Sequence, residues 1–194
     1  MLVFCTSGKG QNKFDWYSET ASQGVRIQNS LPVGMGSLDS SGRTGYTDSS
    51  GKFFGYLIFF SRVINETATS LELTLNFPAD FASPYSYLKL LLPPDTMTLD
   101  KESLFNYGVT DLKSFLDNSF NKPTMLQRTI NPKEECLFHI VALWSKFEGR
   151  PSKFGGVARA ELALKENDLF YRITGITPEL DSALIPCGNI IYKK

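Results

Sequence analysis

The sequence has little of what catalytic and metal sites are usually built from. Its 194 residues include one histidine, His139, and three cysteines, with no Cys-x-x-Cys pair. A single histidine excludes a zinc site made of several histidines from one chain. The Gly-x-Ser-x-Gly motif of α/β-hydrolases and the Gly-x-x-x-x-Gly-Lys-Ser/Thr phosphate loop are also absent. We therefore expect no metal and no other cofactor.

An excess of charge of either sign is missing too. Lys and Arg total 20, Asp and Glu total 20, and the formal net charge is zero. This balance gives no electrostatic attraction to nucleic acid or to an anionic membrane surface. No apolar run approaches the roughly 20 residues that a membrane-spanning helix needs. We expect no nucleic-acid partner and no membrane span, which leaves an unknown protein or carbohydrate as the partner.

Aromatic residues, in contrast, are plentiful at 13%, with 15 Phe and 8 Tyr. Such a composition favours β-strands. The 42% of hydrophobic residues and 21% of charged residues are ordinary for a folded globular protein. A chain of this length suits one domain with a sizeable core.

Hydrophobic periodicity predicts a mostly β, antiparallel sandwich of about nine strands. Residues 54–64 and 136–144 carry apolar side chains at both parities, as expected for central strands that are buried on both faces. Residues 71–77 alternate strictly between apolar and polar, which indicates a strand with one face in water. Turn-forming residues separate the strands at spacings typical of a sandwich.

The segment 100–120 breaks this β pattern and predicts an insert of two short helices. Asp100 is suited to cap the first helix, and Gly108 is suited to end it. From Thr110 onward, four apolar residues recur at helical spacing, so we expect one stripe to pack on the sandwich. These residues are Leu112, Phe115, Leu116 and Phe120.

Two phrases of the sequence resemble known domains. Val63-Ile-Asn-Glu-Thr67, followed by Leu71-Glu-Leu-Thr-Leu75, is similar to a strand and turn of bacterial immunoglobulin-like domains. Asn131-Pro-Lys-Glu-Glu-Cys-Leu-Phe138 is similar to a corner of the same domains. The whole chain resembles uncharacterised secreted proteins of the Bacteroidetes. The resemblance implies an immunoglobulin-like β-sandwich and transfers no catalytic residue.

The N-terminus predicts export. Met1–Cys5 is a short apolar stub, and Gly8 and Gly10 are spaced as a signal-peptidase site requires. Residues 1–10 are therefore interpreted as the remnant of a signal peptide, and residues 11–194 as a single β-sandwich domain. This predicts a periplasmic or extracellular protein. The alternative is an ordinary N-terminus of a cytoplasmic protein.

Removal of the stub would leave two cysteines, Cys136 and Cys187. An even pair is compatible with an oxidising compartment. If their strands are neighbours, the two residues could form a disulfide. Two buried free thiols are the other interpretation, because free Cys behaves as a small hydrophobe.

Hydrolytic chemistry has weak candidates. His139 lies in the middle of a predicted strand, on a face with Leu137, Val141 and Leu143, and is better interpreted as a core residue than as a catalytic base. Three carboxylate pairs could serve a cell-envelope hydrolase. Each pair lies in a predicted turn, where acidic residues are expected anyway: Glu134 with Glu135, Asp95 with Asp100, and Glu166 with Asp168.

The most suggestive segment is the loop 145–156, which repeats Ser-Lys-Phe-x-Gly. Aromatic and cationic side chains on a loop suit carbohydrate stacking or a protein partner. The candidate ligand-binding residues are Lys146, Phe147, Arg150, Lys153 and Phe154. A Gly/Ser-rich loop, 34–51, could lie at the same end of the sandwich. The sequence thus favours a non-catalytic binding module, with the hydrolase as the alternative and a packed, solvated loop as the simpler explanation of the motif.

Overall fold

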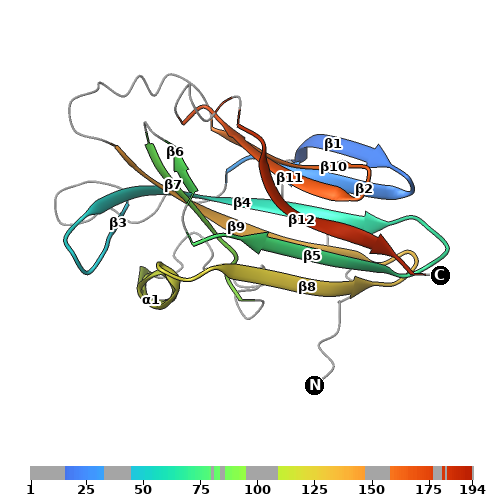
Figure 1. Cartoon of the computed structure of the whole chain (residues 1–194), viewed down its shortest axis with the longest axis horizontal. Coiled ribbons are helices and arrows are strands. Elements are labelled where there is room, and N and C mark those ends of the chain that lie inside the picture. Colours follow the sequence, from blue (N-terminus) through green and yellow to red (C-terminus); the bar gives the residue numbers. More distant parts are fainter. Residues whose placement is uncertain are drawn as a thin grey trace.

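The computed structural model describes residues 16–32, 45–79, 81–83, 86–94, 109–146, 158–176, 181 and 183–193. These residues form two antiparallel β-sheets and one α-helix (Figure 1). The predicted signal remnant, 1–10, and the first predicted helix, 100–108, lie outside the described residues.

The first sheet has the strand order β1-β2-β4-β9-β7-β6, and β3 pairs with the start of β4. Its strands are β1 (Trp16–Ser22), β2 (Val25–Ser30), β3 (Tyr46–Thr47), β4 (Phe53–Asn65), β6 (Phe81–Ser83), β7 (Ser86–Leu91) and β9 (Glu135–Lys146).

The second sheet has the order β10-β11-β12-β5-β8. Its strands are β5 (Leu71–Phe77), β8 (Thr124–Ile130), β10 (Arg159–Lys165), β11 (Asp168–Thr174) and β12 (Ile185–Tyr192), and the helix is α1 (Val109–Ser119). The structure therefore adds β1, β3 and β6 to the nine strands predicted. The number nine was wrong because these three are short or largely exposed and carry no clear alternation.

The central pair β4–β9 confirms the prediction of strands buried on both faces. The two strands pair from Gly55 opposite Trp144 to Ile64 opposite Glu135. One face contributes to the core between the sheets, through residues such as Leu57, Phe59, Val63, Phe138 and Ile140. The other face builds a second apolar cluster, through Phe54, Tyr56, Ile58, Phe60, Val141 and Leu143.

Helix α1 covers this second cluster. Leu112, Leu116 and Phe120 are buried in it, and Phe115 is half-buried against it, so the predicted apolar stripe is confirmed. Phe120 lies just beyond the helix, and its ring centroid is 4.9 Å from that of Phe54 in β4. Tyr46 of β3 donates a hydrogen bond to the Asp117 carboxylate at 2.9 Å, which fixes the helix to the start of the sheet.

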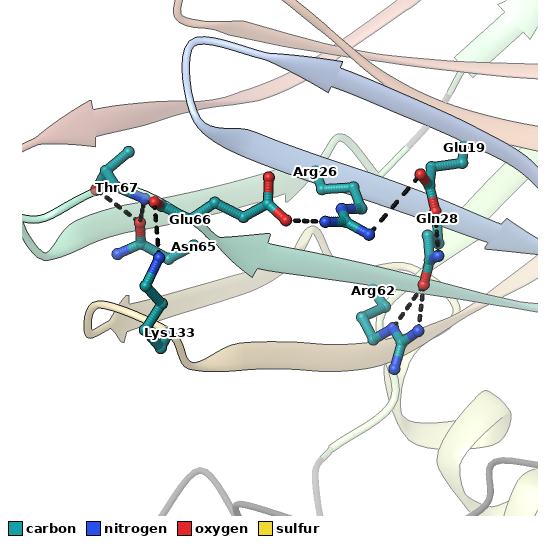
Figure 2. A network of polar contacts seen from close by, with 8 residues as sticks. All are labelled: Glu19, Arg26, Gln28, Arg62, Asn65, Glu66, Thr67 and Lys133. Atoms are coloured by element: carbon teal, nitrogen blue, oxygen red, sulfur yellow. Dashed lines mark hydrogen bonds and ion pairs between the residues drawn. The ribbon is translucent and has the colours of Figure 1, made fainter.

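Asn65 joins the β4–β5 turn to the β8–β9 turn. Its buried side-chain amide donates to the carbonyls of Thr69 (2.8 Å) and Ile130 (2.9 Å). Its side-chain oxygen accepts from the Thr67 amide, and its backbone N–H donates to the Glu134 carbonyl, both at 2.9 Å. The β4–β5 turn and the β8–β9 turn are therefore held against each other, as Figure 2 shows in part.

A second buried asparagine, Asn29, joins β2 of the first sheet to β10 of the second. Asn29 of β2 accepts from the Leu162 amide at 2.9 Å and donates to the Leu162 carbonyl at 3.3 Å. Tyr17 of β1 donates to the Ala160 carbonyl at 2.9 Å. Side chains of the first sheet thus take up the backbone groups that edge strand β10 would otherwise present to solvent.

Cys136 and Cys187 are both buried, and no disulfide joins them. Cys136 lies in β9 of the first sheet and Cys187 lies in β12 of the second, and both belong to the core between the sheets. The structure therefore has two buried thiols that do not pair with each other, one of the two alternatives that the sequence left open. Burial raises the pKa of the Cys187 thiol to about 12, so this group is protonated at neutral pH.

We expect Asn65→Ala to lower the free energy of unfolding by at least about 2 kcal/mol, because the Thr67 amide would lose its partner and the buried Ile130 carbonyl would lose a hydrogen bond. Urea denaturation measures this change. Asn76→Ala, at an exposed position in β5, is the matched control and should cost about 0.5 kcal/mol or less. Equal effects of the two substitutions would show that the Asn65 bonds do not hold the turns together.

We expect Leu116→Ala to lower the free energy of unfolding by about 2–5 kcal/mol, because it opens a cavity between α1 and the first sheet. Ser114→Ala, on the exposed side of the same helix, provides the control for changes in helix propensity. Thermal denaturation of both variants would test this. A stability of Leu116→Ala close to that of the control would mean that the helix contributes little to covering β4 and β9.

Candidate functional site

The predicted binding loop leaves the first sheet at the end of β9. Lys146 is the last residue of β9, and its backbone pairs with Ser86 of β7. The other four candidate residues, Phe147, Arg150, Lys153 and Phe154, lie outside the described residues. The structure thus places the start of the loop, while the roles of these side chains stay a prediction.

The described flanks of the two loops lie at the same end of the first sheet. Gly55 is opposite Trp144, so the start of β4 lies beside the end of β9. The residues that precede β4 belong to the Gly/Ser-rich segment, and β3 folds back onto Phe53 and Phe54. We call residues 45–55 together with residues 144–146 the loop end (left side of Figure 1).

Trp144 lies opposite Gly55 at the loop end. Its half-buried indole packs against the core between the sheets and lies across Gly55. A Cβ atom at position 55 would be 2.7 Å from Cζ2 of Trp144, so any side chain there would displace the indole. Glycine within an apolar strand signals such a close approach, but the sequence alone does not reveal that the approaching group is Trp144.

The turn of the loop end is built by Asp48. Its carboxylate accepts hydrogen bonds from the Ser50 amide (2.9 Å), the Ser50 hydroxyl (2.6 Å) and the Lys52 amide (2.9 Å). The ammonium group of Lys52 lies 5.3 Å from the ring centroid of Phe54. The segment Asp48-Ser-Ser-Gly51 is therefore a turn. Residues 16–32, 45–79 and the other described ranges hold no group of three potential metal ligands.

His139 lies where the sequence predicts, on the outer face of β9 with Val141 and Leu143. It is 8% exposed, and its ring centroid is 5.5 Å from that of Phe60. Burial lowers the pKa of His139 to about 4, so the imidazole is neutral near pH 7. Its surroundings are those of a packing residue.

The described carboxylates of the alternative hydrolase have structural partners or lie in an exposed turn. Glu134 accepts from the backbone and the side-chain amide of Asn131, at 3.1 and 3.0 Å. Glu135 forms an ion pair with Arg62 at 3.1 Å. Glu166 and Asp168 are exposed at the β10–β11 turn. The remaining pair, Asp95 and Asp100, lies outside the described residues.

A network of polar side chains that the sequence did not reveal crosses the outer face of β1, β2 and β4 (Figure 2). Arg26 forms ion pairs with Glu19 and Glu66. Arg62 donates to the Gln28 side chain from Nε at 2.8 Å and lies 4.8 Å from the ring centroid of Trp16. Because these cations already have partners within the sheet, the network connects neighbouring strands and offers little to a ligand.

The comparisons with known proteins give no match. No protein-family model, no curated protein and no solved structure is similar to this chain. Within the part of the chain that the structure describes, no helix is long and apolar enough to cross a membrane. Any inference about function therefore depends on the side chains and the geometry described above.

The buried imidazole predicts a loss of stability in acid. Above about pH 6.5, His139 is neutral in both the folded and the unfolded state. Below that pH the unfolded chain binds a proton, whereas folded His139 stays neutral down to about pH 4. The free energy of unfolding should therefore fall as the pH decreases through this window, by up to about 3 kcal/mol from this group.

His139→Phe keeps a ring at this position and removes the titration. Urea denaturation of both proteins between about pH 7 and pH 4 should show the variant gaining stability relative to the natural protein as the pH falls. A constant difference over this range would mean that His139 titrates in the folded protein as it does in the unfolded chain.

Proposed function

We propose that the protein is a non-catalytic binding module that holds a carbohydrate or protein ligand at the loop end. The observation that carries this proposal is the meeting of the flanks of two long loops around Trp144. Loops that gather at one end of a rigid sandwich are a common location for recognition.

The residue types of the loop fit this role. Phe147 and Phe154 would supply apolar rings for stacking, and Lys146, Arg150 and Lys153 would orient polar groups of the ligand. Lys52 and Trp144 lie at the same end of the first sheet but on opposite faces, Lys52 beside Phe54 of the outer cluster and Trp144 against the core between the sheets. A mixture of aromatic and cationic groups on a rigid base suits sugar rings better than it suits a purely apolar ligand.

The proposal includes an immunoglobulin-like domain that is exported to the periplasm or the extracellular space. The contact between the two phrases that resemble such domains supports the first part, since Asn65 bonds to both Ile130 and Glu134. The alternative, a cell-envelope hydrolase, receives no support from the described carboxylates, which have structural partners or lie in an exposed turn.

A glycan array, followed by titration with the best-binding glycan, tests the proposal. Trp16→Phe leaves Trp144 as the only tryptophan, so the change in its fluorescence reports binding at the loop end. In this background, Phe147→Ala with Phe154→Ala should raise the dissociation constant at least about tenfold, which corresponds to about 1.4 kcal/mol.

Phe170→Ala is the matched control, because Phe170 is a half-buried phenylalanine near the far turn of the second sheet. It should leave the affinity unchanged. An unaltered affinity of the double variant, with the fold intact by circular dichroism, would place the site elsewhere. The absence of any binding on the array would contradict a carbohydrate ligand and leave a protein ligand to be tested.

A further inference from the structure

Five strands in the described part of the chain pair on one side only, and they differ in protection; the shortest of them, β3, has two residues. Asn29 and Tyr17 cover β10. The register of β1 shifts between Trp16 and Ser18, and β6 has only three residues. Strand β8 has seven residues in unbroken register with β5, and among the described strands it pairs with β5 alone. A long, regular edge is a template for pairing with another strand.

The hydrogen bonds show which backbone groups of β8 point away from β5. The Asn65 side-chain amide donates hydrogen bonds to both the Ile130 carbonyl and the Thr69 carbonyl, and Thr69 lies just before β5. The Ile130 carbonyl therefore faces β5. Alternation then turns the N–H and C=O groups of Met125, Gln127 and Thr129 outward. The bond from the Arg128 guanidinium to the Gln127 carbonyl, at 2.7 Å, agrees with this assignment.

The side chains of this edge carry little charge. Met125 is 62% exposed, and Gln127 and Thr129 are exposed beside it. Arg128 is the only charged residue in β8. Natural proteins often protect an edge strand with several charges, a proline or a bulge. Two prolines flank β8, at positions 123 and 132, and neither lies within the strand.

We propose that β8 pairs antiparallel with β8 of a second copy of this chain, about a two-fold axis at Gln127. The three residues whose backbone groups point away from β5 are then paired across the axis: Gln127 is opposite Gln127, and Met125 is opposite Thr129. All six of their backbone groups gain a partner, with the second strand replacing Arg128 at the Gln127 carbonyl. On the inner side, Arg128 lies opposite Leu126, so no like charges are directly opposed.

Charge and proline select this register over its neighbours. A two-fold axis at Arg128 would place the guanidinium groups of both copies opposite each other, which is unfavourable. An axis at Leu126 would place Pro123 opposite Thr129, and proline has no N–H to donate. An axis at Gln127 avoids both unfavourable contacts, and of the three registers it gives the most backbone groups a hydrogen-bond partner. The two five-stranded sheets would become one continuous sheet.

Sedimentation velocity of the full chain, from low micromolar to millimolar concentration, tests this pairing. The natural protein should show a concentration-dependent dimer. Gln127→Lys opposes two ammonium groups on the axis and should raise the dimer dissociation constant at least about tenfold. Asn76→Lys places the same charge at an exposed position of the neighbouring strand β5 and should leave it unchanged. Circular dichroism verifies the fold of both variants.

A disulfide across the axis tests the register even if Gln127→Lys disturbs folding. In a Cys5→Ser background, Gln127→Cys should form a covalent dimer on mild oxidation, whereas Asn76→Cys should not. A protein that stays monomeric at all concentrations would overturn the proposal. A dimer that Gln127→Lys does not weaken, or equal cross-linking of both cysteine variants, would also overturn it. Neither result depends on a ligand at the loop end.

Discussion

The pairing of β4 with β9 is the constraint on which the rest of the structure depends. Ten consecutive residue pairs join these strands, and apolar side chains leave the pair on both sides. Such a pair cannot have a face in water without a large loss of hydrophobic stabilisation. The second sheet covers one face and α1 covers the other, so the single described helix completes the burial that the central strands require.

Two buried asparagines give this apolar framework its specific connections. Asn65 fixes the turns at one end, and Asn29 joins β2 to the edge of β10. Apolar contacts alone would permit the sheets to slide, because hydrophobic attraction is non-directional. A buried amide that needs its hydrogen bonds tolerates one arrangement only, since any other leaves polar groups without partners.

The sequence predicts the parts of this fold that depend on local periodicity. The double-sided strands, the alternating strand at Leu71–Phe77 and the helical stripe of α1 are each visible within about a dozen residues. Features that join distant segments were missed. Glycine is required at position 55 because the Trp144 indole lies against it. Likewise, β12 begins at Ile185 although Pro186 and Gly188, taken locally, are residues typical of a loop. Gly188 has a φ of 148° and passes too close to the Thr74 carbonyl for a side chain.

The two proposed contact regions have a definite geometric relation. The β8–β9 turn lies at the end of β8, and β9 then runs to the loop end, so β8 starts on the side of the loop end and runs away from it. A two-fold axis at Gln127 reverses the strand direction between copies. The two loop ends of a dimer would therefore lie at opposite ends of the joined sheet. Such a dimer is suited to connect two separate ligands. Bivalent binding to one flat surface would require both loop ends on the same side of the dimer.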